Sequence, residues 1–200
     1  LDNESNDPRI VKAVISYNDL KDAAWNFGSQ EEIAVRAKLD KLGVKLGSVS
    51  RKTFQGIVTS ADPIYILEEI ERPQNGLVRV FSKNTQKEYQ LETAIVKPLL
   101  KGSDINRYSI KSYKYRIIFP YLSQNGKSSL ILKATFEKQY ERTWKYLKEN
   151  EEHLRGREKG KMDHDNWYAY VYPKNLEEFS KPKILIQVLA NQASMTVDLE

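Results

Sequence analysis

The stretch LVRVFSKNTQKEYQLE, residues 77–92, decides the fold class of this 200-residue chain. LVRVFS and KEYQLE each have the length and composition of a short strand, and the four polar residues KNTQ separate them. Two such segments around a short polar connection are typical of a β-hairpin. The sequence therefore predicts two antiparallel strands in this stretch.

The neighbouring sequence repeats the pattern. KYRIIFPY (114–121) and SSLILKA (128–134) flank LSQNGK, whose Asn125-Gly126 pair is a strong signal for a hairpin turn. Upstream, Asp62-Pro63 reads as a turn that leads into another strand. Close to the end of the chain, KILIQVLA (183–190) looks like a buried strand, and the residues after 194 look like the start of one more.

Two segments have helical character. In SQEEIAVRAKLDKL (29–42), Ser29 and Glu32 have the spacing of a capping box, and Gly43 and Gly47 are expected to end the helix. A longer helix is expected in FEKQYERTWKYLKENEEHL (136–154). Its apolar residues keep helical spacing: Phe136, Tyr140, Trp144, Leu147 and Leu154. Because strands and helices do not alternate regularly, the sequence predicts an α+β fold, with a mixed, largely antiparallel sheet and two main helices.

Composition limits what the protein can be. With 40% hydrophobic residues the chain can bury a real core. The formal net charge of +5 favours a polyanionic partner such as nucleic acid. The absence of cysteine excludes disulfides and thiolate metal sites, and it fits a reducing, cytoplasmic location. No apolar run approaches the roughly 20 residues of a membrane span, so no membrane partner is expected.

Three short patterns come close to catalytic or metal-binding motifs. ADPIY (61–65) resembles the Pro-Pro loop of amino-methyltransferases, but Ile64 replaces the second proline. Asp7 with Asp19-Leu20-Lys21 has the spacing of a nuclease metal site, a match that arises by chance in so charged a chain. Asp163-His164-Asp165 reads as a solvated loop. We therefore expect neither a catalytic residue nor a metal site in this chain.

Positive charge and aromatic rings gather in two other places. Residues 97–116 contain six basic side chains and one acid, Asp104, with three interleaved tyrosines. The basic residues are Lys97, Lys101, Arg107, Lys111, Lys114 and Arg116. Residues 155–161, RGREKGK, add Arg155, Arg157, Lys159 and Lys161, and Trp167, Tyr168 and Tyr170 follow. Basic groups neutralise phosphates and rings stack on bases, although a solvated face with core aromatics would give the same pattern.

Five segments, taken in order, resemble the carboxy-terminal target-recognition domain of TaqI-like adenine-specific DNA methyltransferases, a domain also found in fused restriction–modification enzymes. They are FQGIVTSADPIYIL, VKPLLKGSDINRY, RIIFPY, WKYLKENEEHLRGREKG and WYAYVYPKNLEEFSKPKILI. The resemblance covers the chain from about residue 30 to its end. Ser60 departs from it, because the family often has glycine there.

The resemblance implies that catalysis and DNA recognition belong to two separate domains. A separate amino-terminal catalytic domain of a longer parent chain would bind S-adenosylmethionine and methylate adenine N6. Residues 1–28 would be a lead-in from that domain, and residues 29–200 would bind double-stranded DNA and select its sequence. This chain would then be a non-enzymatic piece whose partners are DNA and the parent's catalytic domain.

The resemblance also suggests roles for the two basic regions. Lys97, Lys101, the amides of Gly102 and Ser103, Arg107 and Lys111 would contact the DNA backbone, as would Arg157, Lys159 and Lys161. Base-reading candidates are Arg155, Trp167, Tyr168 and Tyr170, on a long irregular segment able to enter a groove. Asp104 and Tyr108 have structural alternatives, in which Asp104 caps a turn and Tyr108 packs beneath it. An RNA-binding domain, a protein-interaction domain and a small nuclease remain the rival functions.

Overall fold

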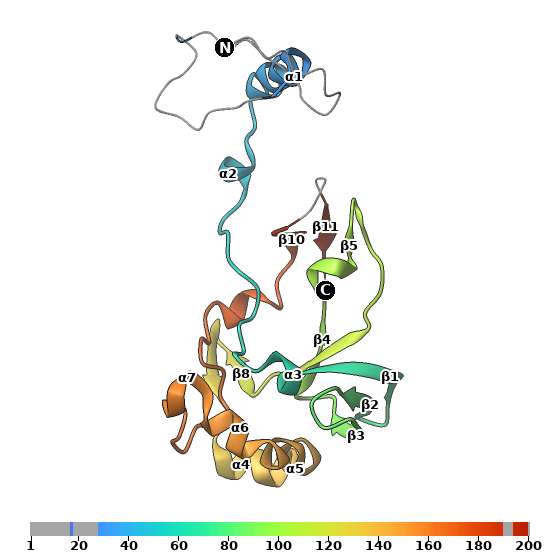
Figure 1. The fold of residues 1–200 in the computed structure, drawn as a ribbon, viewed down its shortest axis with the longest axis vertical. Helices are drawn as coiled ribbons and strands as arrows, with labels where there is room; N and C mark the ends of the chain where they lie inside the picture. Colours follow the sequence, from blue (N-terminus) through green and yellow to red (C-terminus); the bar gives the residue numbers. More distant parts are fainter. Residues whose placement is uncertain (1–16, 18–27, 190–193, 200) are drawn as a thin grey trace, which may run out of the picture. The chain divides into compact units, whose positions relative to one another are not determined.

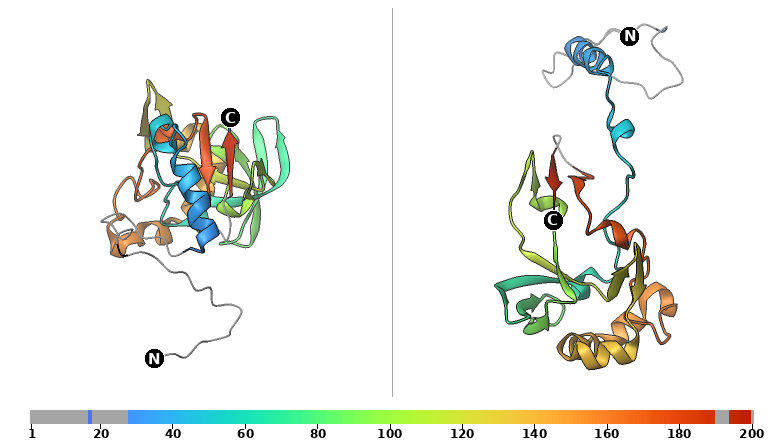
Figure 2. Two further views of the ribbon diagram at one scale, coloured as in Figure 1. Left: turned by 90° about the horizontal axis from the view of Figure 1, so that it is seen from above. Right: turned by 180° about the vertical axis from the view of Figure 1, so that it is seen from behind.

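The computed structural model describes residue 17 and residues 28–189 and 194–199 (Figures 1 and 2). Its chain divides into two compact units between Phe54 and Gln55, whereas the sequence suggested a division after residue 28. Asp7 and the Asp19–Lys21 triplet, together with nearly all of the expected lead-in, lie outside the described residues.

The first unit contains α1 (Gln30–Asp40) and the single turn α2 (Leu46–Val49). The capping box is confirmed: the Ser29 hydroxyl accepts from the Glu32 N–H at 3.3 Å, and the Glu32 carboxylate accepts from the Ser29 N–H at 2.7 Å. The helix ends at Asp40, three residues before the glycine expected to stop it. No residue of α1 is buried within the described part of the chain.

The second unit is built on a five-stranded antiparallel sheet with the order β3-β2-β1-β7-β4. Its strands are β1 (Ile66–Gln74), β2 (Leu77–Ser82), β3 (Lys87–Glu92), β4 (Val96–Leu99) and β7 (Tyr115–Ile118). The opening stretch of sequence forms the predicted hairpin, with Leu77 opposite Glu92 and Ser82 opposite Lys87. The α+β class and the largely antiparallel pairing are therefore confirmed.

Three two-stranded ribbons complete the β-structure. They are β5 (Ile105–Asn106) with β6 (Ser109–Ile110), β8 (Tyr121–Gln124) with β9 (Lys127–Leu130), and β10 (Lys183–Ile186) with β11 (Met195–Asp198). The Asn125-Gly126 turn joins β8 and β9, as predicted, and both residues have positive φ. The prediction of one continuous strand over residues 114–121 is nevertheless wrong. The strand breaks at Pro120, which has no N–H for a strand ladder, and its first part joins the large sheet as β7.

The expected helix over residues 136–154 is broken into α4 (Lys133–Gln139), α5 (Glu141–Glu149) and α6 (Glu151–Arg155). The breaks fall at Tyr140 and Asn150, which have non-helical backbone angles. Glu92 on β3 explains the first break, because its carboxylate accepts hydrogen bonds from the N–H groups of Arg142 and Thr143 at 2.9 and 3.0 Å. A new helix start is thus capped by a distant strand.

The remaining short elements are α3 (Asp62–Tyr65), α7 (Arg157–Gly160) and the 3₁₀ turns η2 (Gly102–Asp104) and η3 (Leu176–Glu178).

The prediction that residues 183–190 form a buried strand is wrong. No residue of β10 is buried, and Ile184 and Ile186 are each 51% exposed on the face opposite Leu185.

Aromatic rings form much of the core of the second unit. Trp144 packs on Trp167 at 5.3 Å between ring centroids, Phe136 on Tyr168 at 5.5 Å, and Tyr65 on Tyr170 at 5.1 Å edge to face. Figure 1 shows α5 close to β3, and the coil after α7 returns into this core. The three rings of the segment expected to enter a DNA groove are therefore interior, whereas its residues 158–161 and 163–166 are exposed.

Candidate nucleic-acid interface

The first basic region folds into a compact structure that we call the basic hairpin, residues 101–111, made of η2, β5 and β6. Asp104 organises it. Its side chain is only 7% exposed and accepts a hydrogen bond from the Lys101 N–H at 2.8 Å, and its carbonyl accepts from the Lys111 N–H at 2.8 Å. The alternative in which Asp104 caps a turn is the one that the structure supports. The single acid of residues 97–116 is therefore used internally.

A second ribbon fixes the hairpin in place. The Tyr108 N–H donates to the Met195 carbonyl on β11 at 2.7 Å, and the Gln187 amide donates to the carbonyls of Gly102 and Ile105. β11 contacts both β5 and β6, and Figure 1 shows β5 and β11 side by side. The hairpin is thus held by hydrogen bonds along both its turn and its base.

Three lysines of this region have no acidic partner among the described residues. Lys97 on β4 and Lys111 are exposed, and the Lys101 ammonium lies 3.9 Å from the centre of the Tyr115 ring. Within the described part of the chain, none of the three pairs with a carboxylate. The other two basic residues beyond the hairpin differ, because Lys114 lies 3.5 Å from Glu68 and Arg116 pairs with Glu69.

The turn of the hairpin also presents backbone donors. Gly102 and Ser103 are exposed at the start of η2, and neither N–H has an acceptor among the described residues. Lys111 lies beside them, with its ammonium 3.4 Å from the Ser103 carbonyl. Arg107 is exposed at the turn between β5 and β6. Exposed N–H groups beside a lysine are suited to an anionic group such as a phosphate.

The structure corrects the role predicted for Arg157. This side chain is 6% exposed, and its guanidinium donates to four carbonyls: those of Leu154, Thr59, Trp167 and Ala169, at 2.5–3.0 Å. A buried guanidinium needs such acceptors to compensate for the water it loses. Arg157 therefore joins three segments of the core and does not reach a phosphate.

Arg155 is also engaged within the protein. Its guanidinium donates to Glu151 at 2.8 Å and to Asp163 at 2.9 Å, and it lies over the Trp167 ring at 5.6 Å. Glu151 lies four residues before Arg155, and this i,i+4 spacing in the sequence could have indicated the ion pair. An arginine that reads guanine needs a free fork, and this fork is occupied. The structure therefore engages Arg155 in contacts within the protein, and its base-reading role stays a prediction.

The three aromatic residues predicted to read bases are buried. Trp167, Tyr168 and Tyr170 are 1%, 0% and 2% exposed, so none can stack on a base in this conformation. The Tyr168 hydroxyl donates to the Ile131 carbonyl at 2.6 Å, and burial raises the pKa of the Tyr170 phenol well above its usual value. Of the second basic region, only Lys159 and Lys161 remain exposed as the sequence predicted.

The structure also exposes an aromatic residue for which the sequence left two alternatives open. Tyr108 is 79% exposed at the turn of the basic hairpin and does not pack beneath it. Its backbone φ is +65°, in the left-handed region. Its position directly after Arg107, within a basic segment, was the signal that the sequence offered.

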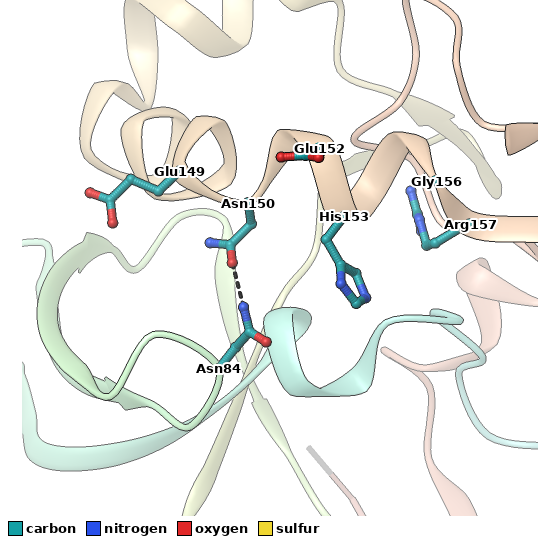
Figure 3. A pocket seen from close by; sticks show the side chains of 7 residues that line it. All are labelled: Asn84, Glu149, Asn150, Glu152, His153, Gly156 and Arg157. Atoms are coloured by element: carbon teal, nitrogen blue, oxygen red, sulfur yellow. Dashed lines mark hydrogen bonds between the residues drawn. The ribbon is translucent and has the colours of Figure 1, made fainter.

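Two pockets lie in the second unit, and Lys97 lines one of them. One, of about 570 Å³, lies beside α5 and α6 (Figure 3), where the Asn84 amide donates to the Asn150 side chain at 2.6 Å. The other, of about 470 Å³, is lined mainly by apolar residues from β4 and η3 and by the Lys183–Asp198 pair, 2.7 Å apart. No group of three or more histidine, aspartate or glutamate side chains in the described residues could hold a metal ion.

Comparison of the sequence with models of known protein families gives no match, and comparison with curated proteins gives none either. In the described part of the chain, no helix is both long and apolar enough to cross a lipid bilayer. The candidate site therefore rests on its own geometry.

Proposed function

We propose that this chain binds double-stranded DNA through the basic hairpin and the lysines beside it. In this role it would be the target-recognition domain of an adenine-N6 DNA methyltransferase or a fused restriction–modification enzyme. One observation carries the proposal. The region's only acid is buried as a cap, while Lys97, Lys101 and Lys111 have no carboxylate partner among the described residues. Such a surface attracts phosphates at long range and binds them at short range.

The proposal assigns different tasks to different parts. The lysines and the Gly102 and Ser103 amides contact the DNA backbone, with Lys159 and Lys161 as further candidates. The chemistry of methyl transfer, and S-adenosylmethionine, belong to a catalytic domain of the parent chain. The resemblance of the VKPLLKGSDINRY segment to the recognition domains supports this assignment, since that segment forms β4 and much of the basic hairpin.

The salt dependence of binding tests the proposal. We expect Lys97→Ala, Lys101→Ala and Lys111→Ala each to weaken binding to any duplex, and to lower the slope of log affinity against log salt by about one. Fluorescence anisotropy with a labelled 20-base-pair duplex at several salt concentrations measures this. Lys145→Ala is the control, because that exposed lysine pairs with Glu141 on α5. Unchanged slopes in all three variants would rule out the assignment.

A second candidate function is protein interaction, and one surface favours it. On the ribbon of β10 and β11, Ile184 stands opposite Val197 and Ile186 opposite Met195, and all four side chains are at least 36% exposed. Adjacent exposed apolar side chains are typical of protein contact sites. If a duplex does not bind while Ile184→Lys disrupts association with another protein, this second function is favoured.

A further inference from the structure

Tyr108 combines an exposed ring with a backbone conformation that disfavours it. Its φ of +65° lies in the left-handed region, where the Cβ atom of an L-residue crowds the backbone and glycine or asparagine is preferred. The other positive-φ positions among the described residues hold glycine or small or polar residues. Tyr108 is the only aromatic residue in this set. Stability of the turn alone does not account for a tyrosine here.

The ring contributes nothing visible to packing either. It is 79% exposed and makes no hydrogen bond or ring contact with any other described residue. The backbone beneath it is nevertheless fixed, since the Tyr108 N–H bonds to Met195 and Asn106 pairs with Ser109 across the turn. The side chain is thus presented outward from a rigid turn.

The surroundings indicate what such a ring would meet. Arg107 precedes it, and Lys101 and Lys111 lie at the base of the same hairpin. A polyanionic strand held by these cations would bring its bases towards the tip of the hairpin. Aromatic side chains stack on bases of any identity, and a tyrosine on a fixed backbone has only two side-chain torsions, so it loses little conformational entropy when it does so.

We propose that the Tyr108 ring stacks on a nucleobase that leaves its position in the bound DNA. The inference rests on the proposed DNA binding and adds the feature recognised: an unstacked base beside the phosphates that the hairpin holds. Extruding a base costs less free energy when the base is already unpaired. The protein therefore binds a duplex with one unpaired base more tightly than the matched duplex, by about tenfold for one stacked base.

Three variants separate stacking from other roles of this residue. The probes are two labelled 20-base-pair duplexes, one fully matched and one with a single central bulged adenine. Tyr108→Phe keeps the preference for the bulge, because the ring remains. Tyr108→Gly and Tyr108→Asn abolish it, and their thermal midpoints are no lower than that of the unmodified protein, because both residues accept a positive φ.

Each result decides a separate question. If neither duplex binds in a salt-dependent manner, the proposed function itself fails. If both duplexes bind but the unmodified protein shows no preference, or Tyr108→Gly retains one, only the stacking inference fails. Loss of the preference in Tyr108→Phe assigns the effect to the hydroxyl and overturns stacking. A clear fall in the thermal midpoint of both Tyr108→Gly and Tyr108→Asn shows that the ring is structural, which also overturns it.

Discussion

At the scale of single residues, Arg157 shows how a charged side chain can serve the core. The sequence RGREKGK has the composition of a solvated surface, and nothing in its spacing separates Arg157 from its exposed neighbour Lys159. The two residues differ because of the tertiary fold. The carbonyls that accept from Arg157 include those of Thr59 and of Trp167 in the coil after α7. Long-range acceptors of this kind cannot be predicted from local sequence.

Removing the Arg157 guanidinium is therefore expected to destabilise the fold. Each buried carbonyl left without a donor costs about 1–3 kcal/mol, so Arg157→Ala should lower the free energy of unfolding by more than about 3 kcal/mol. Arg157→Lys should recover only part of this, since one ammonium cannot reach four carbonyls. Urea unfolding followed by circular dichroism measures both changes. Lys159→Ala, two residues away and exposed, should change stability by no more than about 0.5 kcal/mol.

The opposite result is equally informative. In that case Arg157→Ala changes the stability little and lowers the slope of log affinity against log salt in DNA binding. That result would show that Arg157 contacts a DNA phosphate, as the sequence predicted.

At the scale of elements, local turn and cap chemistry could be predicted from the sequence, but the breaks within the second helical segment could not. Asn125-Gly126 predicted its turn because both positions need positive φ, and the Asn75-Gly76 turn between β1 and β2 has the same chemistry. The helix pattern from Phe136 onward included the buried Phe136, Trp144, Leu147 and Leu154, but it missed the buried Tyr146 and the break at Tyr140. The carboxylate that caps the new helix is 50 residues away on β3, beyond the reach of any spacing rule.

Glu92 gives a prediction at this scale. Besides the two N–H groups, its carboxylate accepts from the Thr143 hydroxyl at 2.6 Å. Because it caps the first turn of α5 and carries the charge that the helix dipole favours there, Glu92→Ala should cost roughly 1–2 kcal/mol of stability. Glu92→Gln keeps the acceptor oxygen and should cost less.

Glu88→Ala is the matched control on the same strand. Glu88 forms an exposed ion pair with Arg79, which should contribute at most about 1 kcal/mol. Equal losses for Glu92→Ala and Glu88→Ala would show that the tertiary cap contributes nothing special to the start of α5.

At the scale of the whole molecule, the fold class followed from the sequence while the division between core and site did not. Basic residues beside aromatic rings marked two regions, and the structure exposes the rings and charges differently in the two. In residues 97–116 the cations and Tyr108 remain on the surface, whereas after Arg155 the rings turn inward. Composition cannot distinguish them, because tyrosine serves equally well as a core residue with one hydrogen bond and as a stacking surface.

The tyrosine-rich core makes the stability of the second unit depend on alkaline pH. Tyr65 and Tyr146 are buried, with hydroxyls donating to the carbonyls of Tyr168 and Ile64 at 2.9 and 2.8 Å. Burial raises the pKa of the Tyr121 phenol to about 12, and it raises the pKa values of Tyr65 and Tyr146 further. In the unfolded chain each phenol has a pKa of about 10.

Between pH 10 and 12 the unfolded state therefore loses protons that the folded state keeps. The stabilisation is complete below pH 10 and declines as pH rises, by up to about 1.4 kcal/mol per pH unit for each such tyrosine. Urea unfolding at pH 8, 10 and 11, with tyrosinate absorbance recorded in parallel, measures this. Tyr146→Phe should make the decline less steep, because one differential ionisation is removed. Constant stability up to pH 11, or early ionisation of all tyrosines in the folded protein, would contradict the buried hydroxyl network.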